Sequence, residues 1–187
     1  MPYAVAYALL LPDQVSNAIR ELQLDVRARY GANTDLRHPP HITVKAPFDA
    51  GDLDAHMRYV DAVARGSAPF DIELDGIDFF DDPQPVAFVN VAMPNAGLAR
   101  LTDTIRRDLG AEARPSPYEA ANTVRYHATI SLLAADALAR ARRDYAAVRP
   151  RFRFRAERLA LFVGFGDGEW TVLRVAALGG PGPLVSR

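Results

Sequence analysis

The sequence predicts an α+β protein built as an internal duplication. Segments with the two-residue period of strands alternate with segments whose apolar residues recur every three to four positions, as in amphipathic helices. The order strand, helix, strand, helix, strand occurs once in each half of the 187 residues. In each half the middle strand begins with a histidine, His41 in the first half and His127 in the second.

The first half begins with an apolar run, residues 4–11, that is typical of a buried strand. A helical stripe follows and stops at Gly31, a residue suited to a helix C-terminus. Residues 41–48 alternate between apolar and polar side chains, as a half-buried strand does. A second helical stripe covers residues 53–64, and residues 70–80 alternate again as a third strand.

The second half follows the same plan, with a long proline-containing loop, residues 111–125, before its histidine strand. Its predicted elements are a strand at 86–93, a helix at 98–109, the histidine strand at 127–133, a helix at 138–148, and final strands at 152–165 and 170–178. A tight turn at 166–168 joins the last two strands as a hairpin. We therefore expect one domain, residues 1–187, with lobe-forming repeats at 1–82 and 84–180 and a tail at 181–187.

Composition limits the class of protein. Hydrophobic residues make up 49% of the chain, which is enough for a core without disulfides or a structural metal. The absence of cysteine excludes disulfides, a thiolate nucleophile and cysteine-ligated zinc, and it fits a reducing cytoplasm. The apolar N-terminal run lacks a basic lead-in and is too short for a membrane span, so we expect a cytoplasmic monomer with no membrane contact. Because the net charge is −1, any anionic substrate must be held by local positive charge.

The two histidine strands share one pattern, which is histidine, apolar, threonine, apolar, polar. Side chains alternate faces along a strand, so the polar residues of each pattern are expected on one face. They are His41, Thr43 and Lys45 in the first strand and His127, Thr129 and Ser131 in the second. The apolar residues between them can pack beneath helices, whereas two polar faces must meet water, a ligand or each other. We therefore expect the two polar faces to form one site.

Two histidines at one site suit the cleavage of a phosphodiester, in which a nucleophile loses a proton and a leaving oxygen gains one. Histidine titrates near pH ~6.5, so at neutral pH one copy can be neutral while the other is charged. Thr43, Thr129 and Ser131 are expected to bind the phosphate through their hydroxyl groups. Lys45, the only lysine of the chain, is expected to add positive charge where negative charge develops.

Residues around the motifs give weaker signals. Tyr118 and Tyr126 flank the second motif and are candidates to stack on a base, and the loop at 111–125 is a candidate lid. Arginines alternate with Pro and Phe from Arg149 to Arg155. This stripe predicts either a wall that holds an RNA backbone or, with slight preference, a solvated strand face.

The other two histidines carry no strong signal. His38 is read as an exposed residue near the motif, and His56 as a boundary residue of the second helix without a catalytic role. No helical His-Glu pattern or second ligand cluster accompanies His38 and His41, so no metal site is expected.

The motifs His41-Ile42-Thr43-Val44 and His127-Ala128-Thr129-Ile130 resemble those of the two-histidine (2H) phosphoesterase superfamily. The chain is most similar to the bacterial 2′-5′ RNA ligase and cyclic phosphodiesterase group, and the resemblance covers nearly the whole chain. It implies two lobes, each an antiparallel sheet with helices on its outer face, and a central cleft into which both histidines point. It also implies that both threonines contact phosphate and that no metal or other cofactor takes part.

Two positions depart from the pattern of this family. Related proteins often have a basic residue just after each motif, where this chain has Lys45 in the first copy but Ser131 in the second. Tyr126 replaces a proline that is often found before the second histidine. These departures bear on the choice of substrate more than on the type of reaction.

The resemblance implies a metal-independent phosphoesterase that acts on 2′,3′-cyclic phosphates or 2′-5′ phosphodiester bonds, in RNA ends or small cyclic nucleotides. Opening a 2′,3′-cyclic phosphate is expected to leave a 2′-phosphate and a free 3′-hydroxyl. We take His127 as the base and His41 as the acid, and the residues alone leave that order open. The alternative is a non-catalytic module that binds a nucleotide or an RNA end. Because both histidines and both threonines are intact, the enzyme is favoured.

Overall fold

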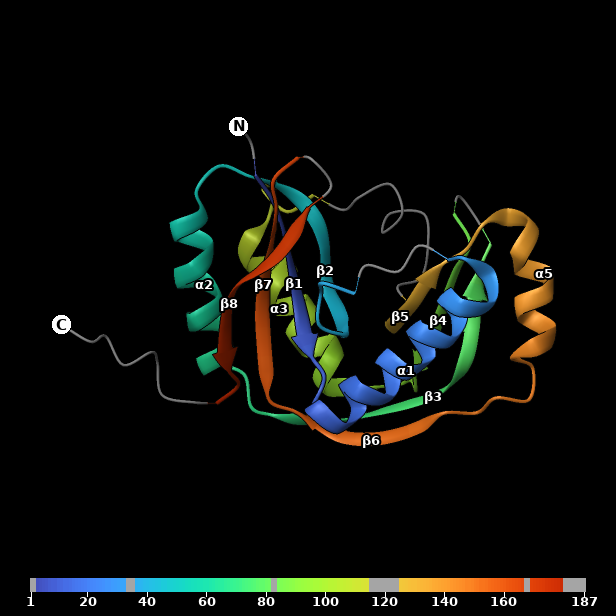
Figure 1. Ribbon diagram of the computed structural model, residues 1–187. Coiled ribbons are helices and arrows are strands. Elements are labelled where there is room, and N and C mark those ends of the chain that lie inside the picture. Colours follow the sequence, from blue (N-terminus) through green and yellow to red (C-terminus); the bar gives the residue numbers. More distant parts are fainter. Residues whose placement is uncertain (1–2, 33–35, 82–83, 115–124, 167–168, 180–187) are drawn as a thin grey trace.

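A computed structural model describes residues 3–32, 36–81, 84–114, 125–166 and 169–179 (Figure 1). Its elements are β1 (Tyr3–Leu10), α1 (Asp13–Tyr30), β2 (His41–Ala50), α2 (Leu53–Arg65), β3 (Phe70–Phe80), β4 (Val86–Val91), α3 (Ala96–Leu109), β5 (His127–Leu132), α5 (Ala135–Asp144), β6 (Arg151–Ala156), β7 (Arg158–Gly164) and β8 (Trp170–Ala177). The helices and the strands up to α5 follow the predicted order, and the α+β class is confirmed. The predicted tail and most of the turn at 166–168 lie outside the described residues.

The strands of the described residues form one curled antiparallel sheet in the order β6-β3-β4-β5-β2-β1-β7-β8 (Figure 1). Its two four-stranded halves meet in the middle, where β2 pairs with β5 through Ile42 and Ala128 alone. The two lobes expected from the sequence are therefore the two halves of one sheet, and the histidine strands are its two central strands.

Each half of the sheet takes strands from both segments of the sequence duplication. β3 follows α2 in the chain but pairs with β4, and β7 follows α5 but pairs with β1. Neither 1–82 nor 84–180 consequently forms a lobe by itself. The exchange ties the halves together, because the chain crosses between them after α2 and again between β6 and β7.

The helices cross between the halves in the same way. α1 packs against β5, and α3 packs against β2, so the first helix of each segment lies beneath the other segment's histidine strand. α2 packs against β7 and β8. The helix boundaries have local causes. Gly31 ends α1 in the left-handed conformation at φ 60°, and the side chains of Asp52 and Asn95 cap α2 and α3 by accepting hydrogen bonds from Ala55 N and Leu98 N.

Two elements differ from the prediction by more than one or two residues at an end. The helix expected over 138–148 spans Ala135–Asp144 and ends in a turn. The strand expected over 152–165 divides at Glu157 into β6, which pairs with β3 at one edge of the sheet, and β7, which pairs with β1 in the other half. The break has no signal in the hydrophobic pattern, because both pieces are strands and only their partners differ.

The core also holds a polar contact that the sequence did not predict. His56 is buried in α2, with 2% of its surface exposed, and is not the boundary residue expected. Its Nδ1 lies 2.7 Å from the hydroxyl of Tyr7 in β1, and its Nε2 lies 3.1 Å from Glu112. Burial raises the pKa of Tyr7 far above its usual range, so its hydroxyl stays protonated and links β1 to α2.

Candidate active site

The two histidine motifs meet at the centre of the sheet. Ile42 and Ala128 are fully buried on the helix side, so the residues that flank each of them project from the opposite face. Continued by one residue in each direction, the antiparallel register sets His41 opposite Thr129 and Thr43 opposite His127. Each histidine therefore faces the threonine of the other motif, and all four side chains are partly exposed on one face.

A small cavity lies at one of these corners. It has a volume of about 180 Å³ and is lined by residues of both histidine strands, among them His41 and Thr129. His38 and Gln23 of α1 also line it. Gln23 holds the two segments in place here, because its side-chain amide donates a hydrogen bond to the Thr129 carbonyl at 3.3 Å.

Each imidazole ring makes the same kind of hydrogen bond, from its Nδ1 to a backbone carbonyl oxygen. Nδ1 of His41 lies 2.9 Å from the carbonyl oxygen of Pro39, and Nδ1 of His127 lies 2.7 Å from that of Arg125. A carbonyl oxygen only accepts, so Nδ1 of each ring must carry the proton that it donates. In the neutral rings Nε2 is then left with its lone pair, and each histidine is set to accept a proton at Nε2.

Aromatic rings from other strands of the sheet pack against both histidines. The ring of His41 lies 4.6 Å from that of Phe162 in β7, centroid to centroid. His127 lies 4.9 Å from Phe88 in β4 and 5.1 Å from Phe80 in β3. These neighbours fix the plane of each imidazole and remove water from one of its faces.

Burial also lowers the pKa of both histidines. Burial lowers the pKa of His41, and like charge on His38 and His127 lowers it further, against the opposing effect of the hydrogen bond to Pro39. Burial also lowers the pKa of His127, opposed by its bond to the Arg125 carbonyl and assisted by the Arg125 charge. Both imidazoles are therefore neutral at pH 7 in the free protein, which differs from the expectation of one neutral and one charged ring.

Lys45 does not join His41 and Thr43 on the polar face. Thr43 pairs with Ala8 and Lys45 with Tyr7, and these two consecutive residues of β1 point to opposite faces. The residue between Thr43 and Lys45 is the extra residue of a β-bulge. Side chains therefore do not keep to the regular alternation of faces that the sequence pattern assumed. Lys45 is consequently buried on the helix side, with 1% of its surface exposed and its ammonium group 5.4 Å from the centre of the Phe48 ring.

A matching bulge moves Ser131 off the polar face. Thr129 pairs with Phe88 and Ser131 with Ala87, again two consecutive residues with opposite directions. Ser131 is buried, and its hydroxyl donates to the Leu132 carbonyl at 3.1 Å. The prediction that Lys45 and Ser131 share a face with the histidines and threonines is therefore wrong, although Ser131 lines the small cavity beside His41 and Thr129.

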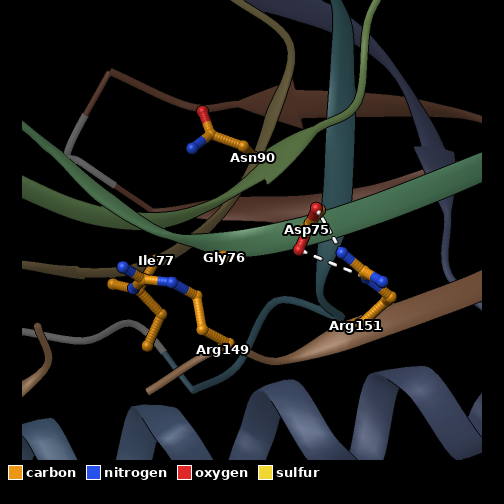
Figure 2. Close-up of a pocket in the computed structure, with 6 residues that line it drawn as sticks. All are labelled: Asp75, Gly76, Ile77, Asn90, Arg149 and Arg151. Carbon is orange, nitrogen blue, oxygen red and sulfur yellow. Dashed lines mark hydrogen bonds and ion pairs between the residues drawn. The ribbon is translucent and has the colours of Figure 1, made fainter. Parts of the chain in front are cut away.

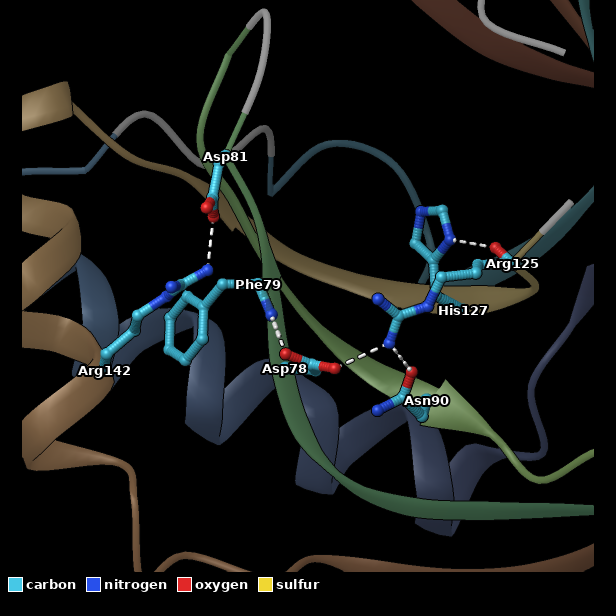
Figure 3. A network of polar contacts seen from close by, with 7 residues as sticks. All are labelled: Asp78, Phe79, Asp81, Asn90, Arg125, His127 and Arg142. Atoms are coloured by element: carbon cyan, nitrogen blue, oxygen red, sulfur yellow. Dashed lines mark hydrogen bonds and ion pairs between the residues drawn. The ribbon is translucent and has the colours of Figure 1, made fainter. Parts of the chain in front are cut away.

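Arg125 is the basic residue that the sequence interpretation missed. Its guanidinium lies over the rings of Phe80 and Phe88, at 5.5 and 5.1 Å from their centroids. Figure 3 shows Arg125 beside His127. It donates to Asp78 at 2.6 Å and to the Asn90 side chain at 2.9 Å. Burial alone raises the pKa of Asp78, but the bonds from Arg125 and the Phe79 N–H outweigh it and lower the pKa below its usual value. Asp78 thus stays charged and holds Arg125 in place.

The other residues predicted near the site are Tyr126, Tyr118, the expected lid and His38. Tyr126 is in the core with 8% of its surface exposed, and its hydroxyl donates to Thr102 of α3 at 2.7 Å, so it does not stack on a base. Tyr118 and residues 115–124 of the expected lid lie outside the described residues. His38 is near the site, with Nε2 2.7 Å from the Trp170 carbonyl.

The arginine stripe is a strand face paired with acids. β6 pairs with β3, and this register sets Arg151, Arg153 and Arg155 opposite Asp75, Glu73 and Asp71. The acids contact the arginines at 3.0 to 4.0 Å. Most of the positive charge of the stripe is therefore compensated along the ladder, as the solvated-face interpretation predicts.

In the described part of the chain, no group of three or more histidine, aspartate or glutamate side chains could hold a metal ion. No described helix is long and apolar enough to cross a membrane.

Comparison with protein families identifies the group to which this arrangement belongs. Residues 11–168 match the sequence model of the 2′-5′ RNA ligase superfamily. The chain belongs to this superfamily. Membership supports a phosphoesterase-type function, in agreement with the resemblance of the two motifs. The comparison with curated proteins found no match.

Solved structures share the fold of this 2′-5′ RNA ligase superfamily member. TT0787 of Thermus thermophilus is 23% identical and aligns over 96% of this chain and 99% of its own, with a TM-score of 0.68. Escherichia coli LigT, in complex with NADP+, is 18% identical and aligns over 96% and 100%, with a TM-score of 0.62. A third structure, of a phosphoesterase, is 18% identical and aligns over 95% and 99%, with a TM-score of 0.64. At these identities the likeness establishes the fold.

Proposed function

We propose that the protein is a phosphoesterase that opens 2′,3′-cyclic phosphates or cleaves 2′-5′ phosphodiester bonds, with His41 and His127 as the proton-transfer pair. The observation that carries the proposal is the matched state of the two rings. Each donates Nδ1–H to a backbone carbonyl and so presents Nε2 for proton transfer, on the face where the two motifs meet. One such histidine is common in proteins, but two held alike on paired strands suit a reaction that moves two protons.

The charge around each histidine favours one order of proton transfer. Arg125 is always charged, and its guanidinium beside His127 opposes protonation of that ring. The like-charge neighbours of His41 are His38 and His127, which can themselves be neutral. His127 is therefore assigned as the base and His41 as the acid. An anionic phosphate bound between them favours the charged form of His41 and opposes its lowered pKa.

Each bond change in the reaction has a partner in this arrangement. Water attacks phosphorus and gives a proton to His127 Nε2 as the new P–O bond forms. The bond from phosphorus to the ribose 3′ oxygen breaks, and His41 Nε2 protonates that oxygen. The product is a 2′-phosphate with a free 3′-hydroxyl, and the two histidines exchange protons with solvent to restore the starting state.

Three further groups are assigned to the phosphate. The hydroxyls of Thr43 and Thr129 lie across the strand pair from the opposite histidines and donate to the non-bridging oxygens. Arg125 takes the role that the sequence pattern had given to Lys45, because it lies beside His127 and carries a permanent charge. The substrates proposed for this set of groups are RNA ends and small cyclic nucleotides. The protein is proposed to act as a monomer in the cytoplasm.

The test is turnover of a panel of 2′,3′-cyclic nucleotides and 2′-5′-linked dinucleotides in the presence of EDTA, with the products identified by NMR. The proposal expects a 2′-phosphate product and no dependence on metal. Activity that disappears in EDTA and returns with a divalent metal overturns the two-histidine mechanism. Tight binding of the same ligands without any turnover instead supports the alternative, a nucleotide-binding module of the same fold.

A further inference from the structure

A second polar pocket lies on the sheet next to the candidate active site. It has a volume of about 690 Å³ and is lined by Asp75, Gly76, Ile77, Asn90, Arg149 and Arg151 (Figure 2). None of these residues belongs to the histidine motifs. The pocket is formed where β3 passes between β4 and the start of β6.

The pocket is continuous with the surroundings of His127 through one residue. Asn90 of β4 pairs with His127 of β5, so their side chains lie on the same face of the sheet. The Asn90 side-chain oxygen accepts a hydrogen bond from Arg125, whose carbonyl holds His127 (Figure 3). Asn90 is therefore shared by the catalytic histidine's network and by the pocket, and a ligand at one reaches the other without crossing the sheet.

Gly76, one of the lining residues, lies in a bulge of β3 that forms part of the pocket wall. The pairing of β3 with β4 shifts register between Leu74 and Ile77, and Gly76 in this bulge has φ +74°. Only glycine adopts this conformation at little cost. Its N–H donates to the Pro150 carbonyl at 3.0 Å, which holds the segment carrying Arg149 against the bulge. The floor of the pocket is consequently backbone, with the Arg149 side chain 3.8 Å from where a Cβ at position 76 would lie.

Arg149 differs from the other arginines of the stripe in how its charge is compensated. Arg151 is paired with Asp75 at 3.0 Å, and Arg153 lies 4.0 Å from Asp71. Within the described residues no carboxylate contacts Arg149, whose guanidinium makes one long hydrogen bond, 3.4 Å, to the Val148 carbonyl. The positive charge of the pocket that is not already compensated by an acid is therefore that of Arg149.

We propose that this pocket binds the backbone phosphate of a nucleotide upstream of the reacting phosphodiester, so that the protein acts on the end of an RNA strand in preference to a mononucleotide. The inference rests on the proposed function. Arg149 directly precedes β6, which lies three strands from β5, about 14 Å at the usual strand spacing. Stacked nucleotides advance about 3.4 Å each, so a short oligonucleotide spans this distance and a single nucleotide with one phosphate does not.

The experiment compares Arg149→Ala with Arg153→Ala, which removes an exposed arginine of the same stripe outside the pocket. Each variant is assayed on a mononucleotide 2′,3′-cyclic phosphate and on a tetranucleotide that ends in a 2′,3′-cyclic phosphate. Arg149→Ala is expected to raise KM for the tetranucleotide about tenfold or more, because it removes one charge-assisted phosphate contact. Its kcat, its activity on the mononucleotide and both activities of Arg153→Ala are expected to stay unchanged.

A salt series adds a readout that a structural role does not move. Binding of a labelled tetranucleotide with a 3′-terminal phosphate is measured by fluorescence anisotropy at several salt concentrations. Loss of one phosphate contact lowers the slope of log affinity against log salt by about 0.7 for single strands. Arg149→Ala should show this smaller slope and Arg153→Ala the slope of the unmodified protein.

The outcomes separate this inference from the proposed function. Equal losses on both substrates, equal effects of the two variants, or no effect of Arg149→Ala each overturn the pocket assignment. If the unmodified protein turns over neither substrate, the proposed function fails, and the anisotropy measurement still decides the pocket. In that case weaker binding by Arg149→Ala alone supports it, and equal binding by both variants rejects it.

Discussion

Ile42 and Ala128 are paired at the junction of the two histidine strands, and this single pair joins the two halves of the sheet. On either side of it, each histidine lies opposite the threonine of the other motif. The strand order β2-β1-β7-β8 mirrors β5-β4-β3-β6 around the same pair. The candidate site is thus centred on an approximate two-fold relation, so it presents two like groups to one phosphate.

Replacing either histidine should abolish turnover without unfolding the protein. His41→Ala and His127→Ala each remove a proton carrier, which typically contributes about 10²–10⁴-fold to the rate. The measurement is kcat/KM on a 2′,3′-cyclic nucleotide, with circular dichroism to verify the fold. His38→Gln is the comparison variant. The His38 ring nitrogen is held by the Trp170 carbonyl, so turnover should persist, with a raised pKa of His41 because charge on His38 helps to lower it. If a folded His41 or His127 variant keeps near-normal activity, the paired mechanism is wrong.

The two threonines should have partial and similar effects. Thr43→Val and Thr129→Val keep the shape of the side chain and remove one phosphate donor, so we expect losses of about 10- to 100-fold in kcat/KM. Thr43→Ser and Thr129→Ser retain the donor and should recover most of the activity. A serine variant as impaired as its valine counterpart indicates that the methyl group, and not the hydroxyl, is what the site requires.

Lys45→Met should leave the chemistry largely intact. The bulge turns Lys45 to the helix side, away from His41, and a methionine of similar length fills its buried position. We expect kcat/KM of the folded variant to fall by less than about tenfold, equivalent to ~1.4 kcal/mol. Thermal unfolding is measured in parallel, because the effect of this substitution should be on stability. A loss comparable to that of His41→Ala places Lys45 back in the reaction.

The pH dependence of kcat/KM should be a bell centred below the usual histidine range. His127 must be neutral, so the rate rises as pH passes its lowered pKa, and His41 must be protonated, so the rate falls above its own lowered pKa. Both limbs of kcat/KM report the free enzyme, which sets the optimum below about pH 6.5. The profile of kcat reports the complex, where bound phosphate favours protonation, and should lie at higher pH. An optimum of kcat/KM well above neutral pH contradicts the assignment.

Arg125→Gln should change the pH profile as well as the rate. The charge of Arg125 helps to lower the pKa of His127, so its removal raises that pKa and moves the acidic limb of kcat/KM to higher pH. Loss of a charged phosphate donor should also lower kcat/KM by about 10²-fold. Arg125→Lys keeps a charge and should shift the limb less. An unchanged acidic limb in Arg125→Gln means that Arg125 is not near the group that acts as the base.

Local patterns in the sequence were sufficient to predict the helices and strands and the strand face that the four motif residues share. Helical stripes and strand alternation reflect burial of one face, which is a property of each segment by itself, and glycine at position 31 marks the end of α1 for a local reason. The common face of each histidine and threonine was also predictable, because each pair lies two residues apart on one strand before its bulge. The spacing of two places them on a common face in any regular strand.

What the sequence pattern did not contain is the pairing between segments that are distant in the chain. The bulges that turn Lys45 and Ser131 inward depend on how β1 and β4 align with the histidine strands, and nothing in the two motifs marks them. Arg125 reaches the site only because Phe80, Phe88 and Asp78 come from neighbouring strands. The strand exchange between the halves is of the same kind. A strand's own residues determine which of its faces is buried, whereas its partner and register are decided by the packing of the whole sheet.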